Sequence, residues 1–164
     1  MAIELPPITE EQEEDLCGGA EFEHLKIFEF SHWVLYLNQN QAHLGRSYVW
    51  LKRHVDMMRF EHLLPVERDE LFETILPHYS GAVDRLWQPD LVNDAWLGNE
   101  VGIHRGHGHL HLVPRYAQPP RMLDFGRVDF SDPCFGQNFS NAPKRIPTDR
   151  QLQHIKNQIG RQFR

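Results

Sequence analysis

The sequence predicts an α+β fold in which an antiparallel sheet of about five strands packs against one main helix and is followed by a C-terminal helical extension. Five short runs rich in β-branched and aromatic residues predict the strands, at residues 26–30, 32–37, 47–51, 91–99 and 107–116. A longer stretch with helical spacing of apolar residues separates the third and fourth runs. The hydrophobic fraction of 40% in 164 residues is enough for one modest core.

The main helix is predicted over residues 65–87. Pro65 suits the first turn of a helix, and the carboxylates that follow suit its positive N-terminal end. Pro77 lacks a backbone N–H group and should kink or divide the helix. The acidic side chains of residues 67–73 are expected to form a solvated face. Residues 148–163 return to a helical pattern, with apolar positions three and four residues apart: Leu152, Ile155 and Ile159.

Composition divides the chain into three segments but predicts a single domain. Residues 1–21 are acidic and contain a proline pair, so they are expected to form a solvated arm. Residues 22–116 contain all the predicted strands and the main helix. Residues 117–164 begin with a stretch rich in Pro, Gly and Asp and are expected to pack on the same domain as an extension.

Charge and cysteine content narrow the possible functions. The net charge of −6 argues against an extended nucleic-acid surface, because a phosphate backbone needs a continuous basic footprint. Cys17 and Cys134 form no C-x-x-C pair, so neither a disulfide scaffold nor a thiolate zinc site is indicated. The N-terminus lacks a signal-peptide pattern and no run is long enough for a membrane span, so we expect a soluble, cytoplasmic protein.

Three histidines alternate along the last predicted strand. Side chains of a strand point to alternate faces, so His107, His109 and His111 share one face, while Leu110 and Leu112 can enter a core on the other. Surface histidines would be an ordinary explanation for one such residue, but three adjacent imidazoles have mutually unfavourable cationic forms and little packing value. The pattern therefore predicts a functional site.

Two kinds of chemistry fit three imidazoles on one face. Neutral imidazoles two residues apart on a strand can reach a common zinc ion. Alternatively, one neutral ring nitrogen can attack phosphorus while its neighbours fix its tautomer and stabilise the developing charge. Residue types and spacing alone leave both possibilities open.

The sequence context resembles the histidine-triad (HIT) superfamily. Residues 107–115 read His-Gly-His-Leu-His-Leu-Val-Pro-Arg, which is similar to the His-X-His-X-His-X-X motif of that family. Residues 37–54 resemble a second family block, with a ribose-contacting residue, a turn glycine, a hydrophobic strand and a Lys-Arg-His ending. The segments around Pro114-Arg115-Tyr116, Phe130-Ser131-Asp132 and Phe135-Gly136 resemble a bacterial HIT subgroup with a C-terminal extension.

The resemblance implies a role for each candidate residue. His109 would be the nucleophile that takes the α-phosphoryl group, and His107 and His111 would orient it and contact the phosphate or the leaving group. A purine slot with Asn38 on the ribose is also implied. The remaining candidate substrate-binding residues are Phe28, His54, Asn99, His104 and Arg105. Neither a metal nor another cofactor is needed for this scheme.

Several positions depart from the family pattern. Gly108 stands where the family has a bulky apolar residue, and Asn38 stands where many members have Asp. Arg46 replaces a histidine after the glycine and is either a cation near the site or a solvated side chain. Residues 101–106 lack the Gly-Gln-Ser that many members use to contact phosphate, so His104 and Arg105 would have to substitute.

The resemblance implies a nucleotide hydrolase or transferase that acts on a dinucleoside polyphosphate or a nucleoside phosphoramidate. The alternatives are a nucleotide-binding protein with little catalysis and a His-rich zinc-binding protein. A homodimer is also implied, with Trp87, Trp96 and residues 116–139 as candidate contacts. Trp50 and Trp96 are interpreted as core or interface residues rather than ligand contacts.

Overall fold

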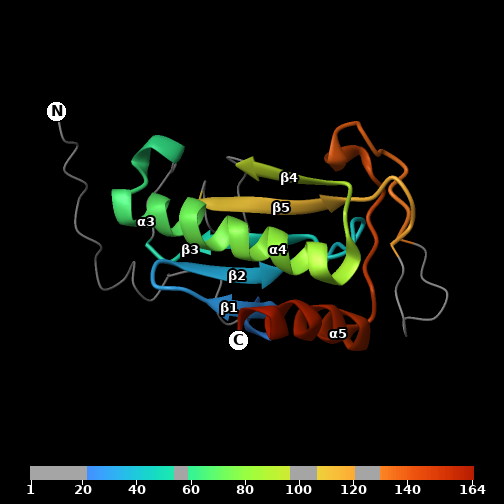
Figure 1. Ribbon diagram of the computed structural model, residues 1–164, viewed down its shortest axis with the longest axis horizontal. Helices are drawn as coiled ribbons and strands as arrows, with labels where there is room; N and C mark the ends of the chain where they lie inside the picture. Colours follow the sequence, from blue (N-terminus) through green and yellow to red (C-terminus); the bar gives the residue numbers. More distant parts are fainter. Residues whose placement is uncertain (1–21, 54–58, 97–106, 121–129) are drawn as a thin grey trace.

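Five antiparallel strands form one sheet in the computed structural model, which describes residues 22–53, 59–96, 107–120 and 130–164 (Figure 1). The strands follow in the spatial order β1-β2-β3-β5-β4, so the strand that carries the histidines is interior. The predicted α+β fold and the predicted strand count are thus confirmed. The strands are β1 (Lys26–Glu29), β2 (Trp33–Leu37), β3 (Ser47–Leu51), β4 (Leu91–Trp96) and β5 (His109–Arg115).

The main helix contains the interruption that Pro77 predicts. It runs through α3 (Pro65–Asp69), a π-helical segment η3 (Glu70–Ile75) and α4 (Leu76–Trp87). Proline cannot donate a hydrogen bond to the preceding turn, and its ring would clash with the carbonyl group four residues earlier. The wider π-helical turns before Pro77 accommodate this defect without ending the helix.

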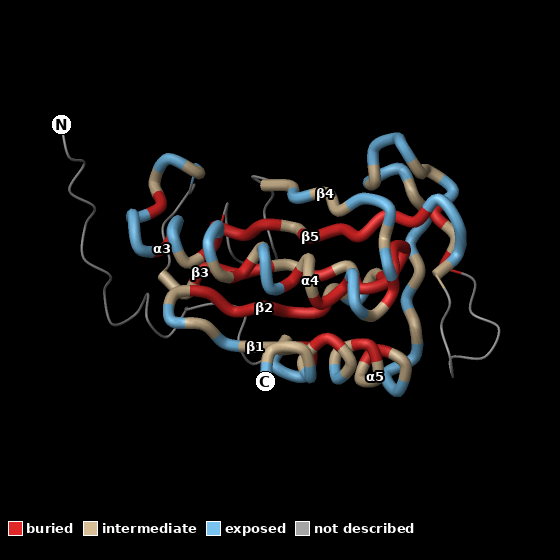
Figure 2. Tube along the Cα trace, viewed as in Figure 1, coloured by how far each residue is buried: buried red, intermediate tan, exposed pale blue. Residues whose placement is uncertain are grey.

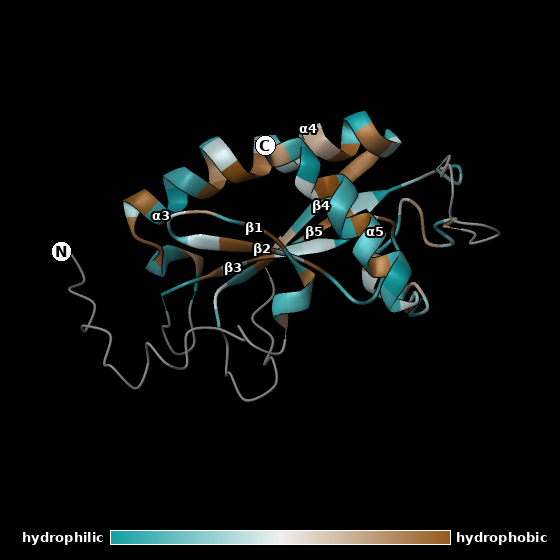
Figure 3. Ribbon diagram, turned by 90° about the horizontal axis from the view of Figure 1, so that it is seen from below, coloured by the Kyte–Doolittle hydropathy of each residue, from teal (hydrophilic) through white to brown (hydrophobic). Residues whose placement is uncertain are grey.

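The hydrophobic core lies between the sheet and the main helix. Figure 3 shows α3 and α4 on one side of the sheet, and Figure 2 shows buried residues along the central strands. The Trp87 ring packs directly against the backbone of Gly45, because an added Cβ atom there would lie 2.7 Å from the ring. The φ angle of Gly45, +83°, is also in the region that favours glycine. Buried residues on this side include Leu35, Val49, Leu51, Leu71, Ile75, Tyr79, Val83, Leu110 and Leu112.

Two acidic side chains of the main helix are structural rather than solvated. Glu67 is 1% exposed and accepts two hydrogen bonds from the Arg53 guanidinium, at 2.6 and 2.8 Å. Glu70 accepts hydrogen bonds from the backbone N–H groups of Ser31 and His32, at 2.9 and 2.7 Å. The expectation of a solvated acidic face is therefore wrong for both residues, which tie the helix to the β1–β2 turn and to the end of β3.

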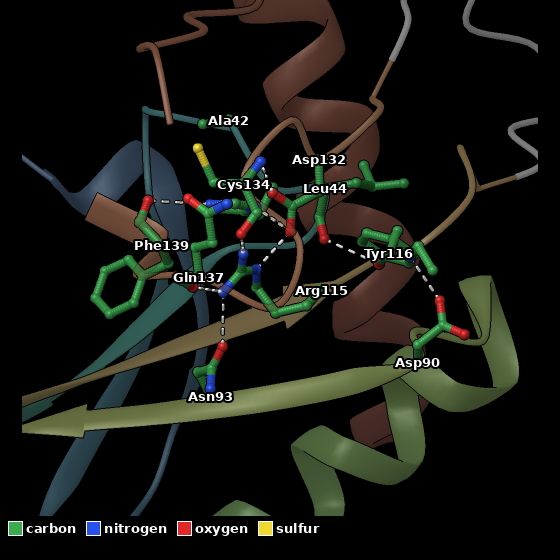
Figure 4. Close-up of polar contacts among 12 residues, drawn as sticks. Ala42, Leu44, Asp90, Asn93, Arg115, Tyr116, Asp132, Cys134, Gln137 and Phe139 are labelled. Atoms are coloured by element: carbon green, nitrogen blue, oxygen red, sulfur yellow. Dashed lines mark hydrogen bonds and ion pairs between the residues drawn. The ribbon is translucent and has the colours of Figure 1, made fainter. Parts of the chain in front are cut away.

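The segment after β5 is held to the sheet by Arg115, which is 2% exposed (Figure 4). Its Nε donates to Asp132 Oδ2 at 2.5 Å, and its terminal nitrogens donate to Asn93 Oδ1 and to the carbonyl oxygens of Gln137 and Cys134. A guanidinium group with several well-placed acceptors can be buried without leaving an unpaired charge. Arg115 thus connects residues 132–137 to β4 and β5.

The chain ends in a second helix, α5 (Asp149–Gly160), which is as long as α4, at 12 residues each. Thr148 caps its N-terminus by accepting a hydrogen bond from the Gln151 N–H group. The fold therefore has two main helices, where one main helix and a helical extension were expected. α5 packs beside β1 and α4 through Leu152, Ile155 and Ile159. In the described part of the chain, no helix is long and apolar enough to cross a membrane.

We expect Asp132→Ala to lower the free energy of unfolding by about 3–5 kcal/mol, because it leaves the buried Arg115 charge without its carboxylate. Urea denaturation at neutral pH would measure this as a lower midpoint. Glu61→Ala is the control, since Glu61 belongs to an exposed pair with Arg59 and its loss should change stability by less than about 1 kcal/mol. Equal effects of the two substitutions would contradict a structural role for Asp132.

Candidate functional site

The register between β3 and β5 decides which side chains surround the histidines. Trp50 pairs with His109, and Tyr48 pairs with His111. Paired residues of neighbouring strands project to the same face, so these four side chains lie on the face opposite α4. The predicted grouping of the histidines on one face is therefore present in the structure.

Backbone carbonyl groups fix the tautomers of two of the three histidines. His109 Nδ1–H donates to the His107 carbonyl oxygen at 2.8 Å, and His107 Nε2–H donates to the Leu51 carbonyl oxygen at 2.6 Å. A carbonyl oxygen can only accept, so the hydrogen of the neutral His109 ring must lie on Nδ1. The ring lone pair of His109 is consequently on Nε2, so Nε2 is the atom that could act as a nucleophile.

Trp50 forms a wall against which two imidazole rings lie. The indole stacks on His107 with ring centroids 4.2 Å apart and on His109 with centroids 5.6 Å apart. His111 completes the group, edge-on to His109 at 4.9 Å. Trp50 is buried in a small hydrophobic cluster with Val34 and Tyr36, and it also lines the same cavity as His109 and His111.

Burial favours the neutral forms of His109 and His111. Desolvation lowers the pKa of His109, although its hydrogen bond to the His107 carbonyl opposes the shift. Desolvation, followed by the charges of His109 and Arg46, lowers the pKa of His111 from 6.5 to about 3. A buried neutral imidazole retains the lone pair that a cationic ring would lack.

A cavity of about 180 Å³ opens beside the histidines. Its lining includes four apolar or aromatic side chains, namely Phe22, Leu25, Tyr48 and Trp50. A flat aromatic ring fits such a wall, while polar groups at one end can orient its substituents. The polar residues of the lining are Asn38, Gln39, His109 and His111.

Several solved structures have a similar architecture. A histidine-triad protein from Bradyrhizobium japonicum has a TM-score of 0.60 at 15% identity, with 87% of this chain and 94% of that chain covered. A hypothetical histidine-triad nucleotide-binding protein from Sulfolobus tokodaii has a TM-score of 0.64 at 14% identity, with 90% of each chain covered. This chain has the histidine-triad fold. The diadenosine triphosphate hydrolase of Plasmodium falciparum shares it, with a TM-score of 0.55 at 14% identity over 85% of this chain and 76% of that one. No protein-family model and no curated protein matches the sequence.

Asn38 lines the cavity, and its side-chain oxygen accepts a hydrogen bond from within the protein. Asn38 Oδ1 accepts a hydrogen bond from the Asn40 N–H group at 2.8 Å, as in a typical Asx turn. Its NH₂ group is then the part that can meet a ligand, and it can only donate. The exchange of Asp for Asn thus replaces an acceptor by a donor at the position that the resemblance assigns to ribose.

Phe28 does not line the cavity of the triad. Its ring stacks on Phe163, with centroids 5.4 Å apart, on the side of the sheet that faces α5. The pairing of β1 with β2 shifts between Lys26 and Phe28, so Phe28 pairs with Leu35, a residue of the main core. This irregularity interrupts the alternation of faces along β1. The prediction that Phe28 contacts a nucleotide therefore has no support from its position.

The other predicted substrate-binding residues, namely His54, Asn99, His104 and Arg105, lie outside the described residues. Sequence reasoning missed Phe22, Leu25, Gln39 and Tyr48 as cavity residues. Tyr48 could have been found, because alternation along residues 47–51 places it on the same face as Trp50. Among the described residues, no group of three His, Cys, Asp or Glu side chains is arranged to hold a metal ion.

We expect His111→Gln to reduce the loss of stability in acid. Between pH 6.5 and about 3 the unfolded chain binds a proton at this histidine and the folded chain does not, so stability falls as the pH falls. The contribution of His111 is at most about 1.4 kcal/mol per pH unit. Urea denaturation at pH 7.5, 6 and 5 would show a smaller decrease for His111→Gln than for the wild type.

The matched control is His24→Gln, since His24 is exposed and lies outside the cavity. This control should keep the wild-type pH dependence of stability. A similar decrease for the wild type and for His111→Gln would contradict the burial of a neutral His111.

Proposed function

We propose that the protein is a nucleotide hydrolase or transferase that acts on the α-phosphate of a dinucleoside polyphosphate or a nucleoside phosphoramidate. The observation that carries the proposal is the tautomer of His109, whose free Nε2 belongs to a ring at the wall of an aromatic cavity. The nucleotide-binding description of the Sulfolobus tokodaii protein and the hydrolase activity of the Plasmodium falciparum protein support the same class of substrate.

In the proposed reaction, Nε2 of His109 attacks the α-phosphorus and forms a nitrogen–phosphorus bond. The bond from phosphorus to the leaving oxygen or nitrogen breaks, and the leaving group takes up a proton. Water, or another acceptor in a transfer reaction, then displaces His109 and restores the neutral ring. Splitting one displacement into two steps is the advantage of a covalent intermediate.

The neighbouring side chains have distinct parts in this scheme. His107 and His111 orient the nucleophile and contact the phosphate or the leaving group. Trp50 keeps His107 and His109 in place by stacking, which limits the rotation that would aim Nε2 away from phosphorus. Phe22, Leu25 and Tyr48 offer apolar surface to the base.

Two other functions are tested by the same experiments. A binding protein with little catalysis would hold nucleotide without turnover. A zinc protein would be purified with stoichiometric metal and would lose stability with a chelator. Mixing the protein with a dinucleoside polyphosphate and trapping a phosphohistidine would support the enzyme over both.

We expect His109→Ala to reduce turnover by several orders of magnitude and to leave nucleotide binding nearly intact, because the substitution removes the atom that forms the bond. His107→Ala and His111→Ala should cost less, about 10²- to 10⁴-fold in rate, as for groups that orient or transfer a proton. Released nucleoside monophosphate measures the rate, and calorimetric titration measures binding. Added imidazole should restore part of the activity of His109→Gly.

A different pattern of losses among the three histidines would contradict the proposed role of His109. Equal losses at all three histidines, together with bound metal in the wild type, would show that the histidines serve as metal ligands instead. His78→Ala is a suitable control for the substitutions, since His78 is exposed on α4 on the opposite side of the sheet.

We further propose a homodimer, as the family resemblance implies. The structure removes one candidate contact, since Trp87 is 7% exposed and packs against Gly45 in the core. Strand β4 is an edge strand, and its Leu91 is 50% exposed, so this edge offers both backbone and apolar groups to a second copy. Trp96 is partly buried next to Phe60 and remains a candidate.

Sedimentation at micromolar concentration should give the mass of two chains. Leu91→Lys should increase the fraction of monomer. At a symmetric contact between two β4 edges, the lysine charge would be buried or would face the same lysine of the second chain. Val66→Lys, at an exposed apolar residue of α3, is the control. A monomer in the wild type would refute the dimer without touching the proposed chemistry.

A further inference from the structure

Arg46 lies at the border of the triad, immediately before β3. Its carbonyl oxygen accepts a hydrogen bond from the Asn38 N–H group at 2.9 Å, which continues the pairing of β2 with β3. Side-chain alternation places Arg46 on the same face as Tyr48, the residue paired with His111. Arg46 is therefore on the face of the sheet that carries the cavity, two residues before the partner of His111.

The Arg46 guanidinium has no anionic partner among the described residues. Its Nε is buried and makes no hydrogen bond there, and the guanidinium carbon lies over the ring of Phe139, 5.5 Å from the ring centroid. Arg53, which is partly buried, and Arg115, which is buried, differ from it, because Arg53 is paired with Glu67 and Arg115 with Asp132. A desolvated charge without a partner is costly, so a position that retains one calls for an anion from outside.

The carboxylate at this end of the molecule is already engaged. Asp132 accepts a hydrogen bond from Arg115 at 2.5 Å and lies 3.4 Å from Nδ1 of the buried His43. His43 Nε2 is in turn 3.3 Å from the Phe139 carbonyl oxygen, so the segment that carries Phe139 is held in place. Arg46 thus rests on a fixed aromatic ring and is kept apart from the charge that could neutralise it.

We infer that Arg46 is the anion-binding group of the site and that it binds the phosphate of the nucleotide beside His111. The inference rests on the proposed function and adds a specificity residue to it. A guanidinium group keeps its charge at any working pH, even though burial lowers the pKa of Arg46. Its planar donors suit phosphate oxygens, and two donors can bind two of them at once.

The electrostatics of the triad agree with this placement. The Arg46 charge contributes to lowering the pKa of His111, so the cation acts directly on that ring. A phosphate between the two groups would satisfy the buried Nε and would face a neutral imidazole, which can donate one hydrogen bond. A nucleoside without phosphate would leave the Arg46 guanidinium without an anion. The contribution of Arg46 to binding should therefore distinguish nucleotides from nucleosides.

Calorimetric titration of the full-length chain with AMP and with adenosine tests the inference. Arg46→Gln should weaken AMP binding about 10- to 100-fold and leave adenosine binding unchanged, as expected when one charge-assisted contact is lost. Arg46→Lys keeps the charge but not the planar fork, so its loss should be smaller. This variant also guards against a folding defect, since it retains the long side chain over Phe139.

Arg145→Gln is the matched control. Arg145 is also half-buried, lies over an aromatic ring, that of Phe130 at 5.3 Å, and has a buried nitrogen without a partner among the described residues. Arg145 precedes α5 and lies over Phe130 rather than beside β3 and His111, so AMP binding should stay as in the wild type. Equal weakening by Arg145→Gln and Arg46→Gln would overturn the inference.

Two further results separate the inference from the proposed function. If AMP binds the wild type and Arg46→Gln equally well, Arg46 is not the phosphate ligand, while nucleotide binding stands. If the wild type binds neither AMP nor adenosine, the proposed function fails. Titration with inorganic pyrophosphate then decides the anion site, because loss of its binding in Arg46→Gln would support the site and unchanged or absent binding would overturn it.

Discussion

Strands β3 and β5 pair in a register that separates two sets of side chains. Trp50 opposite His109 faces the cavity, whereas Val49 opposite Leu110 faces the main helix. A shift by one residue would exchange the two sets, exposing the leucines and placing imidazoles under α4. The apolar core therefore enforces the register, and the register gathers the histidines. Every property of the site, including the stacking on Trp50 and the tautomer of His109, depends on this pairing.

Most of the buried charge in the described residues follows a common physical rule. Arg53 and Arg115 are buried with carboxylates that accept their hydrogen bonds, and both pairs join segments distant in sequence. In the cavity the histidines are neutral, since burial disfavours their protonated forms. Arg46 is partly buried, its Nε makes no hydrogen bond, and no carboxylate of the described residues pairs with it. Arg46 thus puts one fixed positive charge on the face of the sheet that carries the histidines.

Local patterns in the sequence were sufficient for the strands, the helix interruption at Pro77 and the common face of the triad, because each depends on spacing along one segment. Partners distant in sequence were not predictable in this way. Glu67 binds Arg53, 14 residues away, and Glu70 binds the backbone of His32, 38 residues away, so neither could be distinguished from a solvated acid. Phe28 was misplaced because an irregular pairing of β1 changes its face, and such irregularities leave no clear mark in composition.

Arg115 is the last residue of β5, the strand that begins with the catalytic candidate His109. The first residue of β5 thus belongs to the candidate site, and the guanidinium of its last residue donates hydrogen bonds to acceptors of residues 132–137. A shortened chain that ends just after β5 would retain the whole triad motif, but the Arg115 guanidinium would lose its carboxylate and carbonyl partners. The buried groups of β5 thus depend on a longer stretch of chain than the triad motif, and exchanging the C-terminal segment between homologues would require an equivalent set of acceptors for Arg115.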